Sequence, residues 1–378
     1  MTVGLTPTFT LTAHQRQRLQ VLLAALIDQK RASVVVPAQN PSSGFWFGGG
    51  NMIETPDGSI WLTGRYRNFG DSRTGLGAGQ RGLECAIFRS QNRGLTFEKK
   101  LSFSKADLSL PGREVISIEG TALHIMDDRT IELFISTEKE RAYPDGLESF
   151  QKPGTGVWSI DRITGDSVET LSAAIIEPVL ENFDRPEYLH IKDPVVFDTL
   201  DGGTALVFCS HPFTWASSNS GMSIRPAGGA FDPINWEIAT RGAAWDVAAT
   251  RITNRLAVPA VGVFARTPAA YVYFYDGAES LRRLDENSHA ASRPRGYSCE
   301  EIGGAFVGDA LPAPGMERLS LTSPLFISPY GTGSSRYVST LVLEEGILAA
   351  WQQSQEDESQ PLVSHMLPHA DIEQLLKA

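Results

Sequence analysis

The sequence predicts an all-β protein, a five-bladed β-propeller with an N-terminal helix. Five segments repeat the order of a polar residue, a short apolar strand, a turn and a second strand, and they begin 68, 74, 53 and 77 residues apart. Units of this size, built from short strands, are typical of propeller blades rather than of solenoid repeats. The 35 glycines and 22 prolines among 378 residues also suit a chain with many turns. We expect a helical extension over residues 1–32 and one propeller domain over residues 33–378.

The polar residue that opens each repeat is called here its head residue. The third repeat is the clearest: Lys192-Asp193-Pro194 precedes an apolar strand, an Asp-Gly turn at residues 201–202 and a second strand over residues 204–209. The five predicted head residues are Asn51, Glu119, Asp193, Asp246 and Ser323.

The N-terminal segment over residues 11–31 is predicted to form a helix. Thr12 is a suitable N-cap, and Gln15 stands at the offset of a capping box. The apolar residues at helical spacing are Leu19, Leu22, Leu23, Leu26 and Ile27. We favour a helix packed on the side of the propeller over the alternative, a homo-oligomer formed through this stripe.

A short apolar segment, residues 33–38, precedes the first repeat, and the last repeat lacks a strand. Pairing this segment with the last blade would close the ring of blades. An open ring would leave two exposed sheet edges, which are sites of aggregation. We therefore expect residues 33–38 to complete the last blade.

A turn in the first repeat, Ser90-x-Asn92-x-Gly94-x-Thr96-Phe97, resembles the Asp-box of sialidases, with Asn in place of Asp. Such a motif closes a hairpin with side-chain hydrogen bonds. We expect it to be structural and not catalytic.

Composition excludes several classes of partner. The net charge of −11 argues against a nucleic-acid partner, because phosphate binding requires clustered Lys and Arg. No apolar run approaches the roughly 18 residues of a membrane span. Cys85, Cys209 and Cys299 are odd in number and lie in apolar strands, which indicates buried free thiols and a reducing, cytoplasmic location. We find no grouping at metal-ligand spacing and expect neither a metal nor a cofactor.

The candidate site follows from blade geometry. The innermost strand of a blade starts at one mouth of the central channel, and the second strand returns to that mouth. Head residues and the ends of second strands should therefore face the same space. Beyond the head residues, this reasoning selects Arg65, Arg67, Glu138, Lys139 and His211, with Trp46 and Trp245 beside them.

Carboxylates, arginines, a histidine and indoles around one funnel suit a carbohydrate. Carboxylates can perform acid/base chemistry, Arg and His can bind hydroxyls or an anionic substituent, and indoles can stack on sugar rings. Each residue also has a structural alternative, because a head Asp can cap a turn and Arg65 or Arg67 can pair with Asp71 or Glu84.

Lys192-Asp193-Pro194, followed by a strand, an Asp-Gly turn and a second strand, resembles the Asp-Pro blades of the five-bladed glycoside hydrolases of families 43, 32, 68 and 130. The resemblance implies a glycosidase acting on an oligosaccharide or glycoside, with one carboxylate as base or nucleophile, one as acid and one Asp that orients or tunes. Asp193 matches the third role. The sequence departs from the pattern at Asn51, where the families carry an Asp, and it lacks a Glu-Gly-Pro or Glu-Cys acid motif.

Asn51 can bind a substrate but cannot accept a proton at neutral pH. Our first choice for the other catalytic carboxylate is Glu119, because Gly120 would let a substrate approach the backbone. Asp246 is the second choice, and Glu301, in a pair of acids before two glycines, is a further candidate.

Two other functions remain open. A sialidase-like enzyme would set an arginine cluster against a substrate carboxylate and use a Tyr/Glu nucleophile, for which Arg65, Arg67, Arg73, Tyr297 and Glu301 supply the residue types. A non-catalytic sugar-binding propeller would keep the aromatic and arginine contacts alone.

Overall fold

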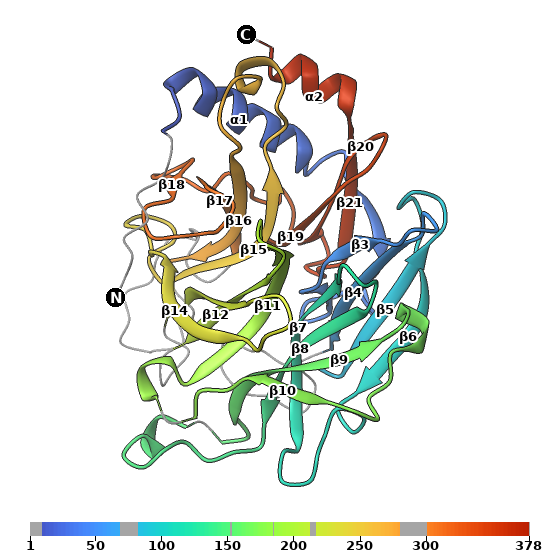
Figure 1. The fold of residues 1–378 in the computed structure, drawn as a ribbon, viewed down its shortest axis with the longest axis vertical. Coiled ribbons are helices and arrows are strands. Elements are labelled where there is room, and N and C mark those ends of the chain that lie inside the picture. The colour runs from blue at the N-terminus through green and yellow to red at the C-terminus, as the bar shows by residue number, and fades with distance from the viewer. Residues whose placement is uncertain are drawn as a thin grey trace.

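The computed structural model describes residues 10–68, 82–151, 153–183, 185–211, 217–279 and 301–377. Five antiparallel sheets surround a central axis, and their innermost strands meet near the centre of the molecule (Figure 1). The fold is the predicted five-bladed β-propeller. No helix in the described parts of the chain is long and apolar enough to cross a membrane.

Each blade follows the chain from the centre outward. Blade 1 contains β2 (Trp46–Gly48), β3 (Met52–Glu54), β4 (Ile60–Arg67), β5 (Glu84–Ser90) and β6 (Glu98–Ser104). Blade 2 contains β7 (Val115–Ile125), β8 (Ile131–Lys139), β9 (Val157–Gly165) and β10 (Glu177–Leu180). Blade 3 contains β11 (His190–Asp198), β12 (Thr204–His211), β13 (Asn219–Arg225) and β14 (Asp232–Ala239). Blade 4 contains β15 (Ala249–Ala257), β16 (Tyr271–Ala278), β17 (Ile302–Gly308) and β18 (Glu317–Arg318).

Blade 5 joins the two ends of the chain. It consists of β19 (Ser335–Val342), β20 (Gly346–Gln353), β21 (Leu362–Pro368) and, on the outside, β1 (Ser33–Val36). Ser33 pairs with Ser364 and Val34 with Val363 in an antiparallel register. The predicted closure of the ring is confirmed, and it covers an edge of β21 that would otherwise be open.

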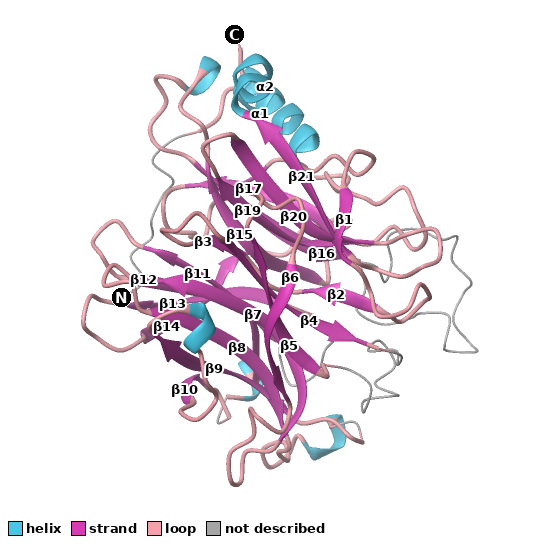
Figure 2. Ribbon diagram, turned by 90° about the vertical axis from the view of Figure 1, so that its right-hand side faces the viewer, coloured by secondary structure: helices cyan, strands magenta, loops and turns pink. Residues whose placement is uncertain are grey.

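The N-terminal helix α1 (Ala13–Leu26) packs on the propeller, as the favoured alternative predicted. Thr12 caps it, with the reciprocal bonds to Gln15 of a capping box. The helix ends earlier than expected, and its stripe of leucines is buried against blades 4 and 5 and against the short helix α2 (His369–Leu375). Figure 2 shows both helices together beside β21. A homo-oligomer formed through this stripe would have to displace these contacts.

The Asn92 turn closes the hairpin between β5 and β6 through its own side chains. The Asn92 amide oxygen accepts the Thr96 N–H at 3.0 Å, and the Ser90 hydroxyl accepts the Gly94 N–H at 2.9 Å. These bonds hold the turn at the outer part of blade 1, so the motif has the structural role that the sequence predicted.

Each innermost strand is interrupted by a β-bulge at the same level of the channel. The bulged residues are Gly49–Asn51 in blade 1, Glu119 and Gly120 in blade 2, Asp193 and Pro194 in blade 3, Thr253 in blade 4, and Tyr337 and Val338 in blade 5. A bulge adds a residue to one strand and redirects its side chain. The five bulges therefore determine which side chains meet in the channel.

Two of the predicted head residues, Glu119 and Asp193, lie at bulges inside the innermost strands rather than at their start, and two others lie outside these strands. β15 begins at Ala249, so Asp246 lies in the segment before it, and β19 begins at Ser335, well after Ser323. The apolar residues after Ser323 misled the prediction, because Phe326 makes only a single bridge, to Gly303, and then a loop follows.

Candidate functional site

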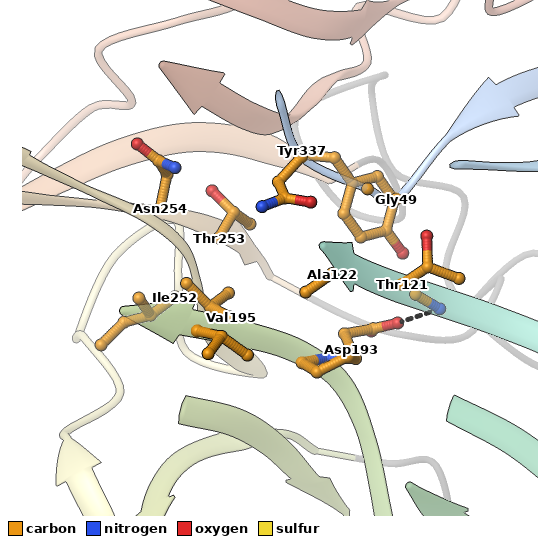
Figure 3. A pocket seen from close by; sticks show the side chains of 14 residues that line it. Gly49, Thr121, Ala122, Asp193, Val195, Ile252, Thr253, Asn254 and Tyr337 are labelled. Carbon is orange, nitrogen blue, oxygen red and sulfur yellow. Dashed lines mark hydrogen bonds between the residues drawn. The ribbon is translucent and has the colours of Figure 1, made fainter. Parts of the chain in front are cut away.

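The five bulges enclose a small cavity on the channel axis. It has a volume of about 40 Å³, which suits a few water molecules rather than a sugar ring. Figure 3 shows Thr121, Asp193 and Tyr337 gathered at one end of the cavity and Val195, Ile252 and Asn254 at the other.

Two residues at this cavity hold a strained backbone. Asp193 has φ +54° and Tyr337 has φ +55°, a left-handed conformation that is unusual for any side chain and rare for a bulky one. Gly49, at the equivalent position of blade 1, has φ +74° and is free of this strain. Strained residues that line a cavity are typical of functional sites.

Asp193 is fixed by one contact from the neighbouring blade 2 and by two from its own blade 3. Its Oδ1 accepts the Gly120 N–H at 3.0 Å, its Oδ2 lies 3.3 Å from the Cys209 thiol, and the Lys192 ammonium is 3.9 Å away. A methyl group added at Gly120 would stand 2.6 Å from Oδ1. Gly120 thus makes room for Asp193, whereas the sequence suggested room for a substrate.

Glu119 forms a buried ion pair with Arg65. The Arg65 Nε donates to its Oε2 at 3.1 Å, and the Arg65 Nη1 donates to the Gly48 carbonyl at 3.2 Å. Burial alone would raise the pKa of Glu119, but the charges of Arg65, Lys192 and Arg67 outweigh it and lower the pKa to about 2. Glu119 is therefore ionised at neutral pH.

Trp46 is surrounded by guanidinium groups. Those of Arg65, Arg67 and Arg336 lie 4.8, 5.1 and 4.0 Å from its ring centroid. The indole is only 8% exposed, so cations rather than a sugar occupy its faces.

Glu301 lies just before β17 and connects two blades. It forms ion pairs with Arg251 of β15 and with Arg336 of β19. Burial would raise the pKa of Glu301, but these two arginines outweigh it and hold the pKa well below its usual range. The structure thus brings the third-choice carboxylate into the same cluster as Glu119 and Asp193, while Arg251 and Arg336 were missed.

Asp276, near the end of β16, was also missed. Both of its carboxyl oxygens accept the Tyr337 N–H, at 3.1 and 3.2 Å. Burial raises the pKa of Asp276 to about 8, even though Arg251 opposes the shift, so this carboxyl holds a proton at neutral pH. Because β16 is the second strand of blade 4, the rule that the ends of second strands face the channel mouth would have identified Asp276 as a candidate site residue.

Three predicted residues have other contacts. Asp246 accepts hydrogen bonds from the Tyr275 hydroxyl at 2.9 Å and from Arg318 at 2.8 Å, and it does not line the cavity. Trp245 is fully buried and stacks on Tyr275, so it cannot offer a flat face to a sugar. Asn51 borders the cavity, but its amide exchanges two hydrogen bonds with the backbone of Leu123.

Two further predicted residues lie in the buried wall of the funnel. Glu138 accepts the Gly156 N–H at 2.7 Å. Burial, with the charge of Lys192, holds the pKa of His211 far below its usual value, so this imidazole is neutral. Arg73 and Tyr297, proposed for a sialidase-like site, lie outside the described residues. Within the described ranges, no three His, Cys, Asp or Glu side chains are arranged to hold a metal ion.

The fold and the site define the class of this protein: a five-bladed β-propeller with a buried cluster of acids and bases at one mouth of its channel. No protein-family model and no curated protein matches the sequence.

Solved structures match the chain in fold. A thermostable family-43 glycoside hydrolase is 10% identical, with a TM-score of 0.52 over 86% of this chain and 91% of that one. The GH43_1 enzyme from Xanthomonas citri, complexed with xylotriose, is 11% identical, with a TM-score of 0.53 over 94% of each chain. BT0996, in an RGII complex, is 11% identical, with a TM-score of 0.58 over 92% of this chain and 94% of that one. At these identities, the likeness shows that this chain has the propeller fold found in family-43 glycoside hydrolases.

Proposed function

We propose that this protein is a glycoside hydrolase that acts at the mouth of the propeller channel. The observation that carries the proposal is a buried cluster of carboxyl groups: Glu119 binds Arg65, which lies 3.4 Å from the Tyr337 hydroxyl, and the Tyr337 N–H donates to Asp276. Neighbouring cations lower the pKa of Glu119 to about 2, and burial raises the pKa of Asp276 to about 8, so the two groups favour opposite protonation states at neutral pH. Hydrolysis of a glycosidic bond by general acid/base chemistry needs one group of each kind.

The proposed roles follow from protonation and position. Glu119 acts either as the nucleophile that bonds to the anomeric carbon or as the base that takes a proton from a water attacking that carbon, while the bond to the leaving oxygen breaks and that oxygen takes up a proton. Asp276 is our candidate for the proton donor. Asp193 borders the cavity and orients the sugar. This is the role implied by the resemblance of its Lys-Asp-Pro motif to the Asp-Pro blades of the glycoside hydrolases. Because the cavity is smaller than a sugar ring, the substrate lies on the mouth side of it.

The test is turnover of a broad panel of aryl glycosides by the parent and by Glu119→Gln, Asp193→Asn and Asp276→Asn. Loss of an acid or base group should lower kcat by roughly a hundredfold or more. Glu132→Gln is a matched control, because Glu132 is also buried and held by an arginine, Arg225 at 2.7 Å, but lies at the other end of β7 and β8. A parent that cleaves no glycoside, or variants as active as the control, would refute the proposal.

A second candidate is a non-catalytic sugar-binding propeller. It is favoured by Gly49, which stands where blade 3 carries Asp193, and by the ion pairs that engage Glu119 and Glu301. Calorimetric binding of sugars by a parent that turns none of them over would support this alternative.

We also propose a reducing, cytoplasmic location. Cys85 and Cys209 are free and buried, and burial raises the pKa of both thiols. Fractionation of the producing cells tests this proposal.

A further inference from the structure

We infer that His124 is the centre of a pH-dependent latch that holds the end of β11 against blade 2. The latch consists of Glu132, His124 and Asp198, and in it the imidazole ring carries a proton on each nitrogen and joins the two carboxylates. It lies at the end of β7 and β11 opposite to Glu119 and Asp193. The inference therefore goes beyond the proposed function and does not depend on it.

The geometry around the ring determines its protonation. His124 Nδ1 lies 3.0 Å from Glu132 Oε2, and His124 Nε2 lies 2.9 Å from Asp198 Oδ1. A neutral imidazole has one N–H and one lone pair, so one of its nitrogens would direct a lone pair at a carboxylate oxygen. The imidazolium form donates a hydrogen bond to both partners. The arrangement therefore requires a doubly protonated histidine between blades 2 and 3.

Glu132 is the fixed side of the latch. Its side chain is fully buried, and it accepts hydrogen bonds at 2.7 Å from Arg225 of blade 3 and from Arg162 of its own blade. Burial alone would raise the pKa of Glu132, but hydrogen bonds from Arg225 and His124 outweigh it and lower the pKa to about 2. Arg162 is held in turn by Glu177 of β10. Glu132 therefore stays ionised and in place around neutral pH.

Asp198 is the movable side of the latch. Its side chain is 59% exposed, whereas that of His124 is 7% exposed. The hydrogen bond from His124, with the charge of Arg255 of β15, lowers the pKa of Asp198, so this carboxylate is ionised at neutral pH. An exposed carboxylate can turn into water without becoming a buried, unpaired charge.

The protonation of His124 depends on these partners. Burial alone would lower the pKa of His124, but its hydrogen bonds to Asp198 and Glu132 outweigh burial and raise the pKa above the ordinary value of 6.5. A histidine with a raised folded-state pKa contributes stability that is complete below the unfolded pKa and is lost as pH rises through the folded one. The latch is therefore closed at neutral pH and weakens at alkaline pH.

Loss of a proton from the ring opens the latch on one side. One ring nitrogen then becomes an acceptor, and it repels the carboxylate that it faces. Two arginines hold Glu132 in place, whereas Asp198 is exposed, so the bond between His124 and Asp198 breaks. The end of β11 and its hairpin to β12 then lose this tie to blade 2.

The first experiment measures the protonation of His124 by NMR on the full chain labelled with 15N-histidine. Long-range proton–nitrogen correlations give two similar ring-nitrogen shifts for an imidazolium and two widely separated ones for a neutral ring. We expect the imidazolium pattern for His124 at pH 7 and the neutral pattern for His190, whose pKa burial lowers to about 3. The His124 signal is assigned with His124→Gln or, if that variant does not fold, with His124→Asn.

Asp198→Asn tests the contact between the ring and its exposed partner. The variant removes the charge from a charge-assisted hydrogen bond, so the midpoint of the His124 titration should fall by about one pH unit or more. Asp127→Asn is the matched control, because Asp127 is exposed in the turn between β7 and β8 and the change removes the same charge. It should leave the midpoint unchanged.

The second experiment measures opening by hydrogen exchange of the full chain at pH 6 and pH 9, corrected for the intrinsic rate at each pH. We expect the peptides of the β11–β12 hairpin to lose protection about tenfold or more at pH 9, the order expected for one charge-assisted hydrogen bond. Asp198→Ala, which cannot form the latch, should show the lower protection at both pH values. Peptides of β5 in blade 1 are the internal reference and should keep their protection.

Each outcome decides the inference. A His124 titration midpoint above 6.5 that Asp198→Asn lowers, together with the loss of protection at pH 9, would support the latch. A neutral His124 at pH 7, or a midpoint that Asp198→Asn leaves unchanged, would overturn it. Equal protection of the hairpin at both pH values in the parent would also overturn it, because the latch would not open. Neither experiment needs a substrate, so a parent that cleaves no glycoside would overturn the proposed function alone.

Discussion

Replacing Asp276 with Asn should remove a pH dependence of stability. The folded protein holds a proton on Asp276 up to about pH 8, whereas the ordinary pKa of an Asp carboxyl is 3.8. A group with a raised folded-state pKa contributes stability that is complete below the unfolded pKa and is lost as pH rises to the folded one. From about pH 4 to pH 8, Asp276 therefore lowers the free energy of unfolding as pH increases. Asn mimics the protonated acid and carries no such dependence.

The magnitude follows from one proton. The free energy of unfolding should fall by about 1.4 kcal/mol for each pH unit, or about 3 kcal/mol between pH 5 and pH 7. The stability of Asp276→Asn relative to the parent should rise by the same amount over that interval. Contributions of other titrating groups cancel in this comparison, except for the coupling of Asp276 to Arg251 and Glu301.

Urea unfolding followed by tryptophan fluorescence at pH 5, 6, 7 and 8 measures the effect. Asp57→Asn is the control, because hydrogen bonds from Thr55 and Ser59 lower the pKa of Asp57 to about 2, which places its titration below this interval. The free energy of unfolding of Asp57→Asn should differ from that of the parent by the same amount at every pH. A difference between Asp276→Asn and the parent that does not change with pH would mean that Asp276 is ionised in the fold, and our candidate for the acid would be lost.

Three further predictions concern the fold. Gly120→Ala should lower the free energy of unfolding by about 1–3 kcal/mol, because the new methyl group meets Asp193; unchanged urea unfolding would contradict the tight approach. Deleting residues 33–36 should expose the edge of the last blade and cause association, measured by light scattering; a stable monomer would show that closure is dispensable. Asn92→Ala should cost about 1 kcal/mol through the lost Thr96 bond without changing activity, and a loss of turnover would contradict its structural role.

The five-bladed architecture could be predicted because it depends on the spacing of the repeated strands and turns and on the pairing of the exposed sheet edges. Repeated strands and turns determine the number of blades, and an unpaired apolar segment at residues 33–36 had one favourable place, the open edge of the last blade. The blade 4 and blade 5 head residues could not be located, because apolar segments before β15 and β19 have the composition of strands but lie in loops.

The site was predicted only in part, for a physical reason. A β-bulge shifts the side chains of a strand by one residue, and the hydrophobic pattern does not reveal this shift. Tyr337 therefore looked like an ordinary strand residue, although its backbone is left-handed and it borders the cavity. The protonation of Asp276 likewise depends on burial by neighbours that are distant in the sequence.

The absence of a carboxylate at the bulge of blade 1 has a structural counterpart in blade 2. Gly49 occupies the bulge position that Asp193 and Tyr337 hold in blades 3 and 5, and a side chain there would meet Arg65 Nη1 at 2.5 Å. The Arg65 guanidinium thus fills the space that a blade 1 side chain would need, and it binds Glu119. An acid at position 49 would compete with Glu119 for this guanidinium. Gly49 in blade 1 and Glu119 in blade 2 therefore depend on each other. Gly49 leaves room for the Arg65 guanidinium, and this guanidinium binds the ionised carboxylate of Glu119 on the neighbouring blade.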